Sequence, residues 1–98
     1  MNNKIPTPKI SEILLEEFME PLNLSAYAVA KGINVPVSRI QEILHDKRKI
    51  TIDTSIRLGR FFGISDRFFI NLQNDIDMRN EELKNATEYN SIQQLEFS

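Results

Sequence analysis

The 98-residue chain has no cysteine, no tryptophan and a single histidine, His45. Without cysteine, neither a disulfide framework nor a cysteine-based zinc site can form, and one histidine alone is too little for a usual metal site. No apolar run approaches the ~20 residues that a membrane-spanning helix needs, and the N-terminal MNNKIPTPK lacks the apolar core of a secretory signal. We therefore expect a cytoplasmic protein without a membrane contact, a metal or a cofactor.

Glycine and proline are also few, with three and four residues, and they fall between segments in which apolar residues recur at helical spacing. A chain of this length can form one hydrophobic core without disulfides or a metal. These features predict an all-α fold, a compact bundle of about five helices. The expected helices cover about residues 11–20, 25–31, 36–45, 52–62 and 66–77, the last of them running to residue 77 or further.

The segment from Ser25 to Lys49 is the most informative part of the chain, because it has the layout of two short helices joined by a tight turn. Ser25 is a good N-cap for the first helix. Gly32 and Asn34 belong to the residue types that tolerate the positive φ of a turn, and Pro36 suits the first turn of a second helix. The layout predicts a helix-turn-helix unit whose second helix enters the DNA major groove.

Apolar spacing supports the two helices. In the first helix, Val29 and the small Ala30 are expected to face inward, where Ala30 allows the second helix to cross closely. In the second helix, Ile40, Ile43 and Leu44 follow the i, i+3, i+4 spacing of a buried stripe.

Opposite this stripe lies the polar face of the second helix. Steps of about 100° per residue place Ser38, Glu42 and His45 there, flanked by Arg39 and Gln41. Arginine can bond guanine in a bidentate way, glutamine suits adenine, and glutamate accepts from the cytosine amino group. Any surface helix has a polar face, so it is the spacing of the whole unit that favours base contacts here.

Charge is distributed unevenly along the chain, which has a net charge of −2. Residues 31–60 hold seven basic and three acidic side chains, whereas residues 61–98 hold three basic and seven acidic ones. Lys47, Arg48 and Lys49 directly follow the second helix, where they favour phosphate contacts. Screening over about 8–10 Å means that DNA senses mainly this local cluster. We therefore expect two partners, double-stranded DNA and a small basic protein.

The fifth expected helix carries more apolar surface than a chain this small easily buries on one side. An exposed apolar patch usually marks an interface. We therefore expect a homodimer, whose two recognition helices would lie about 34 Å apart on a palindromic operator. Core packing is expected to account for two of the apolar residues of the fifth helix, and the candidates for the dimer interface are drawn from Phe68, Phe69, Leu72 and Ile76.

Over roughly residues 9–79 the chain resembles the HigA-type antitoxins, also called the VapI-like group, within the phage-repressor-like (XRE) family of helix-turn-helix regulators. The resemblance rests on EILLEEFMEPLNLS, VPVSRIQEIL-x-x-KR-x-IT, RLGRFFG and F-x-NLQ. It implies a dimeric bundle of about five helices. It also implies an antitoxin that binds a small ribosome-associated, mRNA-cleaving toxin and represses the operon that encodes both proteins.

The resemblance also implies roles for single residues. The turn position that usually holds glycine in this family is Asn34 here, which adopts a left-handed conformation at modest cost. Groove contacts are implied for Val37, Ser38, Arg39 and Glu42, beside which Gln41 flanks the same face. Phosphate contacts are implied near Ser25, Tyr27, Lys31, Lys47 and Arg48. Residues 1–79 are thus the expected helix-turn-helix domain, and residues 80–98 a polar tail that is mobile or a frayed helix.

Two alternatives remain open at this stage. One is a stand-alone repressor of the same fold with no toxin partner. The other is a helical protein-interaction module that no longer binds DNA, which the net negative charge and the acidic Glu42 favour. An enzyme is not expected, since no glycine-rich loop or other catalytic arrangement accompanies the carboxylates, and no catalytic residue is assigned.

Overall fold

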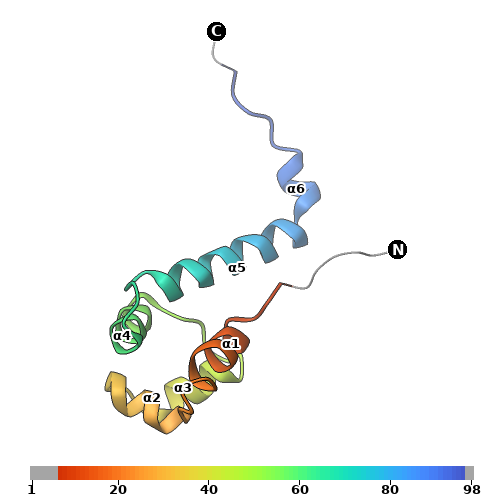
Figure 1. Cartoon of the computed structure of the whole chain (residues 1–98). Helices are drawn as coiled ribbons and strands as arrows, with labels where there is room; N and C mark the ends of the chain where they lie inside the picture. Colours follow the sequence, from red (N-terminus) through yellow and green to blue (C-terminus); the bar gives the residue numbers. More distant parts are fainter. Residues whose placement is uncertain (1–6, 97–98) are drawn as a thin grey trace.

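The structure is a computed structural model that describes residues 7–96. The first six residues of the expected domain and the last two of the expected tail lie outside the described residues. Figure 1 shows that the described chain consists of helices joined by turns, with a non-helical segment at each end and no strand, which confirms the all-α prediction.

The first helical segment combines two kinds of turn. The helix α1 (Ile10–Ile13) continues directly into η1 (Leu14–Met19), a π-helical segment in which the amide of Glu20 donates to the carbonyl of Leu15 at 2.8 Å. The two form the single helix expected at this place. The wider π turn brings side chains five positions apart onto one face. Leu14 and Met19 are accordingly both buried, with exposed fractions of 0% and 2%.

The next three helices are α2 (Ala26–Ile33), α3 (Val37–Leu44) and α4 (Ile52–Phe62). The bounds of α4 agree with the sequence prediction, because Thr51 caps its first turn by accepting from the amide of Thr54 at 3.3 Å. Gly63 ends the helix in the left-handed conformation, with φ 72°. Pro36 lies just before α3 in extended backbone, one position outside the helix that it was expected to open.

The core is formed by side chains from every helix of the bundle. Val29, Ile40 and Ile43 are fully buried, as their spacing predicted, while Leu44 is only half-buried at the edge. An aromatic cluster joins η1 to α4 and α5, where the ring of Phe18 lies 5.0 Å from Phe62. The full set of buried apolar residues is Ile10, Leu14, Met19, Val29, Ala30, Ile33, Ile40, Ile43, Ile50, Leu58, Phe69 and Ile76.

Two of the four candidates for the dimer interface are core residues. Phe69 is fully buried, with its ring 5.1 Å from that of Phe18, and Ile76 is only 9% exposed. Both α1 and α4 pack against α5 and together cover its inner face, so Phe69 and Ile76 are the two that core packing explains. Phe68, at 40% exposed, and the half-buried Leu72 remain available for a dimer contact.

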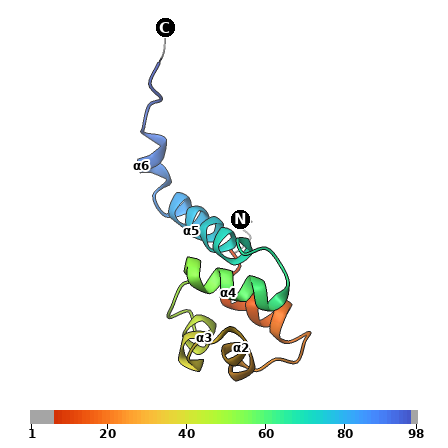
Figure 2. The same ribbon diagram turned by 90° about the vertical axis from the view of Figure 1, so that its left-hand side faces the viewer.

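The C-terminal part projects from the bundle as an arm (Figures 1 and 2). The helix α5 (Phe68–Lys84) extends beyond residue 77, and the short α6 (Ala86–Asn90) follows, so the first part of the expected tail is helical. The hydroxyl of Tyr89 donates to Glu81 at 2.7 Å and so ties α6 to α5. The radius of gyration is 17.0 Å, whereas about 13 Å is usual for a compact domain of this length. The difference arises because the arm extends beyond the bundle.

Candidate nucleic-acid interface

The helix-turn-helix unit lies at the end of the molecule opposite the C-terminal arm (Figures 1 and 2). Its turn depends on Asn34, which adopts the left-handed conformation with φ 60° and ψ 49°. This geometry lets the amides of Asn34 and Val35 donate to the last carbonyls of α2, at 3.3 Å to Lys31 and 3.0 Å to Ala30. Asparagine therefore takes the place of the usual glycine, as the sequence predicted.

Gly32 has a different role from the one expected. It lies inside α2 rather than in the turn, and it is not among the residues with positive φ. A Cβ atom at this position would lie 2.2 Å from the ring of Phe61 in α4. Glycine leaves room here for the Phe61 ring of α4, and only the tertiary structure reveals this contact.

The five residues of α3 that were expected to contact bases differ in exposure and in their partners. Ser38 and Gln41 are exposed, and Val37 is half-buried against the core. Arg39 and Glu42 are half-buried and already have partners: Arg39 pairs with Asp53 of α4, and Glu42 accepts from Arg48 Nε at 3.0 Å. Counting only contacts within residues 7–96, the helix thus offers two polar side chains without a partner, one apolar side chain and two side chains held by ion pairs.

Among the residues expected near phosphates, some have a partner within the described chain and others are simply exposed. The Ser25 hydroxyl accepts from the amide of Ala28 at 3.0 Å, so its first role is to cap α2. Tyr27 is 65% exposed beside it. Lys31 and Lys47 are exposed and form no ion pair within residues 7–96.

The basic run after α3 does not act as a single cluster. Arg48 is paired with Glu42, and Lys49 lies 3.2 Å from Asp77 of α5. Asp46, in left-handed conformation with φ 60°, lies 3.7 Å from Lys9. Within residues 7–96, Lys47 is therefore the one of the three consecutive cations that forms no ion pair.

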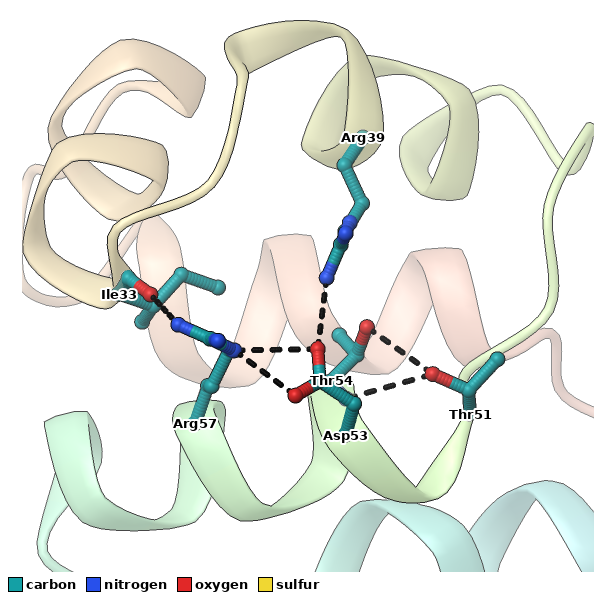
Figure 3. A network of polar contacts seen from close by, with 6 residues as sticks. All are labelled: Ile33, Arg39, Thr51, Asp53, Thr54 and Arg57. Atoms are coloured by element: carbon teal, nitrogen blue, oxygen red, sulfur yellow. Dashed lines mark hydrogen bonds and ion pairs between the residues drawn. The ribbon is translucent and has the colours of Figure 1, made fainter.

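A polar network connects the turn, α3 and α4 (Figure 3). Arg39 Nη1 lies 2.8 Å from Asp53 Oδ2, and Arg57 Nε lies 3.0 Å from both carboxylate oxygens of Asp53. Arg57 Nη1 in turn donates to the carbonyl of Ile33, the last residue of α2, at 2.8 Å. The bond from Arg57, followed by that from Arg39, holds the pKa of Asp53 below its ordinary value.

Sequence reasoning did not identify Asp53 or Arg57 as part of the site. Their i, i+4 spacing on one helix is visible in the sequence and is typical of an ion pair. Nothing in that pattern indicates that Asp53 also reaches Arg39, fourteen residues earlier in the chain.

Other kinds of site find no support in the part of the chain that the structure describes. It holds no group of three or more histidine, cysteine, aspartate or glutamate side chains placed to bind a metal ion. None of the helices within residues 7–96 is both long and apolar enough to cross a membrane.

Comparison with known proteins agrees with this geometry. The helix-turn-helix family model matches residues 15–69. Virulence-associated protein I of Dichelobacter nodosus is 42% identical over 80 residues, which cover 82% of this chain and 74% of that protein. Antitoxin HigA of Pseudomonas aeruginosa, solved with the higBA promoter, matches with a TM-score of 0.84 at 29% identity, covering 93% of this chain and 100% of that one. Antitoxin GraA in complex with its operator matches with a TM-score of 0.85 at 28% identity, covering 99% of each chain.

The matched segment runs from η1 into α5 and includes the whole helix-turn-helix unit. The proteins that it resembles are DNA-binding regulators and antitoxins rather than a class of enzymes. This chain belongs to the helix-turn-helix family, among the proteins of the VapI and HigA type.

Proposed function

We propose that this protein is an antitoxin that binds an operator and represses its own operon, in the cytoplasm where that DNA lies. The observation that carries the proposal is the match to two antitoxins solved on promoter or operator DNA, over 93% and 99% of this chain. A likeness of this extent includes α2, α3 and the turn between them.

The side chains divide naturally between base contacts and phosphate contacts. Ser38 and Gln41 are exposed on α3 and suit hydrogen bonds to base edges, while the Val37 methyl groups suit a thymine methyl. Lys31 and Lys47 suit phosphates, because each offers a solvated ammonium group. Phosphate contacts would set the register of the protein, and base contacts would set the sequence.

The proposal includes a homodimer on a palindromic operator. A single α3 helix contacts few base pairs, so a two-fold pair of recognition helices about 34 Å apart is the usual way to reach high specificity. Phe68 is the exposed aromatic side chain of α5 that would contribute to the contact.

The toxin would bind on the opposite side of the molecule from the DNA. The arm formed by α5 and α6 carries exposed carboxylates, among them Glu81, Glu82 and Glu88, together with exposed apolar side chains such as Met78 and Leu83. A small basic, mRNA-cleaving toxin is complementary to such a surface. Neutralisation by direct binding is therefore part of the proposal.

The DNA-binding function is tested by fluorescence anisotropy over a salt series. The probes are a labelled duplex from the region upstream of the protein's own reading frame and a scrambled duplex of the same composition. We expect nanomolar affinity for the first duplex, much weaker binding to the second, and a steep loss of affinity with salt. Equal micromolar binding to both duplexes would instead favour the helical interaction module without DNA binding.

The antitoxin function needs its own test. The product of the adjacent reading frame is expressed with and without this protein, and growth is measured. Growth arrest that this protein relieves, together with co-purification of the two, supports the antitoxin. Specific operator binding without any partner that it neutralises would leave a stand-alone repressor.

A further inference from the structure

We infer that Asp53 is a positioning residue for DNA recognition: it orients Arg39 for a base without touching DNA itself. The inference rests on the proposed DNA-binding function and deepens it. It assigns part of the sequence preference to α4, outside the helix-turn-helix unit.

The first observation is the geometry at Arg39. This side chain leaves α3 and points toward α4, where its Nη1 lies 2.8 Å from Asp53 Oδ2 (Figure 3). Only 27% of the Arg39 side chain is exposed, so most of its length is already fixed by packing. A guanidinium carries five N–H groups, and the bond to Asp53 occupies only one nitrogen. The other guanidinium nitrogens have no partner within residues 7–96, which leaves them for the two acceptors of a guanine.

The second observation is that Asp53 itself is held from two directions. Both of its oxygens accept from Arg57 Nε at 3.0 Å, and Arg57 is anchored in turn to the Ile33 carbonyl at 2.8 Å. Asp53 also lies in the first turn of α4, where a carboxylate is stabilised by the helix dipole. The carboxylate is therefore a fixed acceptor, tied to the turn that connects the two helices of the DNA-binding unit.

A fixed acceptor reduces the conformational freedom that Arg39 would lose on binding DNA. Because such preorganisation lowers the entropic cost of forming a specific contact, it favours the correct base pair. The charge of Asp53 has the opposite effect on non-specific binding, since it cancels one of the two neighbouring guanidinium charges. Removing the charge should therefore weaken discrimination while strengthening attraction to any DNA.

These opposite directions define the experiment. Asp53→Asn keeps the size of the side chain and removes the charge. Asp66→Asn is the matched control, because it makes the same charge change in a carboxylate that pairs with Arg60 at 3.2 Å, away from α3. Affinities are measured for the upstream duplex and for the scrambled duplex, and circular dichroism confirms that each variant is folded. Asp53→Ser, which keeps a residue suited to the start of a helix, serves as a second variant.

For Asp53→Asn we expect the ratio of specific to scrambled affinity to fall by about tenfold, within the range of one bidentate base contact. Affinity for the scrambled duplex should stay the same or rise. For Asp66→Asn the ratio should stay unchanged. In an Arg39→Ala background, Asp53→Asn should no longer change the ratio, which a merely structural role for Asp53 would not produce.

Three results would overturn the inference. The ratio could be unchanged in Asp53→Asn, it could rise because Asp53 competes with DNA for Arg39, or it could fall equally in the Arg39→Ala background. Failure of the proposed function is distinguishable from each, since it would appear as equal binding of both duplexes by the unaltered protein.

Discussion

The hydroxyl of Ser55 in α4 accepts a hydrogen bond from the amide of Ile70 in α5 at 2.9 Å. The same hydroxyl donates to the carbonyl of Asp66 at 2.6 Å. No side chain from the start of α5 caps its first turn, so the neighbouring helix supplies the cap that is missing. Ser55 is fully buried, which means that water cannot replace it.

Replacing Ser55 by alanine should therefore lower the free energy of unfolding. The change leaves a partly buried amide and a partly buried carbonyl without this partner, which costs about 1–3 kcal/mol. Urea unfolding at constant pH measures the loss. Ser65→Ala is the control, since its hydroxyl accepts from Arg67 at an exposed position and should matter much less. Equal losses in the two variants would contradict the role of Ser55 as a cap between helices.

Two adjacent phenylalanines should respond differently to the same substitution. Phe69→Glu places a carboxylate in the core and should unfold the protein, because Phe69 is fully buried. Phe68→Glu changes a side chain that is 40% exposed and should leave the fold intact. If Phe68 contributes to the proposed dimer, light scattering should show that Phe68→Glu shifts it toward the monomer. A folded and fully dimeric Phe68→Glu variant would remove Phe68 from that interface.

Arg39 and Lys47 should differ in what their loss does to DNA binding. Arg39→Ala should cost about 1–3 kcal/mol on the upstream duplex and relax the preference at one base pair. Lys47→Ala should weaken binding to all duplexes alike and reduce the salt slope by about 1. Anisotropy titrations over a salt series measure both effects. Equal losses on specific and scrambled DNA in both variants would show that Arg39 contacts no base.

Alanine substitutions at the two helical glycines, Gly32 and Gly59, should have different costs. A Cβ at Gly59 would lie 2.6 Å from the carbonyl oxygen of Ser65, whereas one at Gly32 would meet the ring of Phe61. The backbone at Ser65 cannot turn aside, while Phe61 is 37% exposed and can. Gly59→Ala should therefore lower the free energy of unfolding by about 1–3 kcal/mol through overpacking. Its thermal midpoint should fall below that of Gly32→Ala. The reverse order in calorimetry would disprove the argument from packing.

Asp53 should contribute to stability at neutral pH and lose that contribution in acid. Its pKa is lowered in the folded protein, first by Arg57 and then by Arg39, relative to about 3.9 in an unfolded chain. A lowered pKa stabilises the fold above the unfolded value, and the effect disappears as pH falls through the folded value. The difference in stability between the unaltered protein and Asp53→Asn should therefore be constant from about pH 8 to about pH 6 and shrink toward about pH 3. A difference that did not depend on pH would assign the effect to packing.

Much of the fold follows from local signals in the sequence. Thr51 and Gly63 set the ends of α4, and Asn34 sets the turn, because each residue's own conformational preference decides these positions. The π-helical segment η1 was not predicted, since its hydrogen bonds depend on how Leu14 and Met19 fit the core. The sequence left the C-terminal end of α5 open beyond residue 77, because the exposed C-terminal half of this helix has little apolar periodicity to detect.

In the candidate site, too, some features follow from the sequence and others from the tertiary structure alone. The sequence by itself determined the helix-turn-helix unit and the polar residues of its second helix, since spacing along one helix decides which side chains share a face. Only the tertiary structure decided that Arg39 is held by Asp53, that Gly32 lies against Phe61, and that Phe69 is buried. These contacts join residues far apart in the chain. They depend on where α4 and α5 pack, which helical periodicity within any one segment cannot specify.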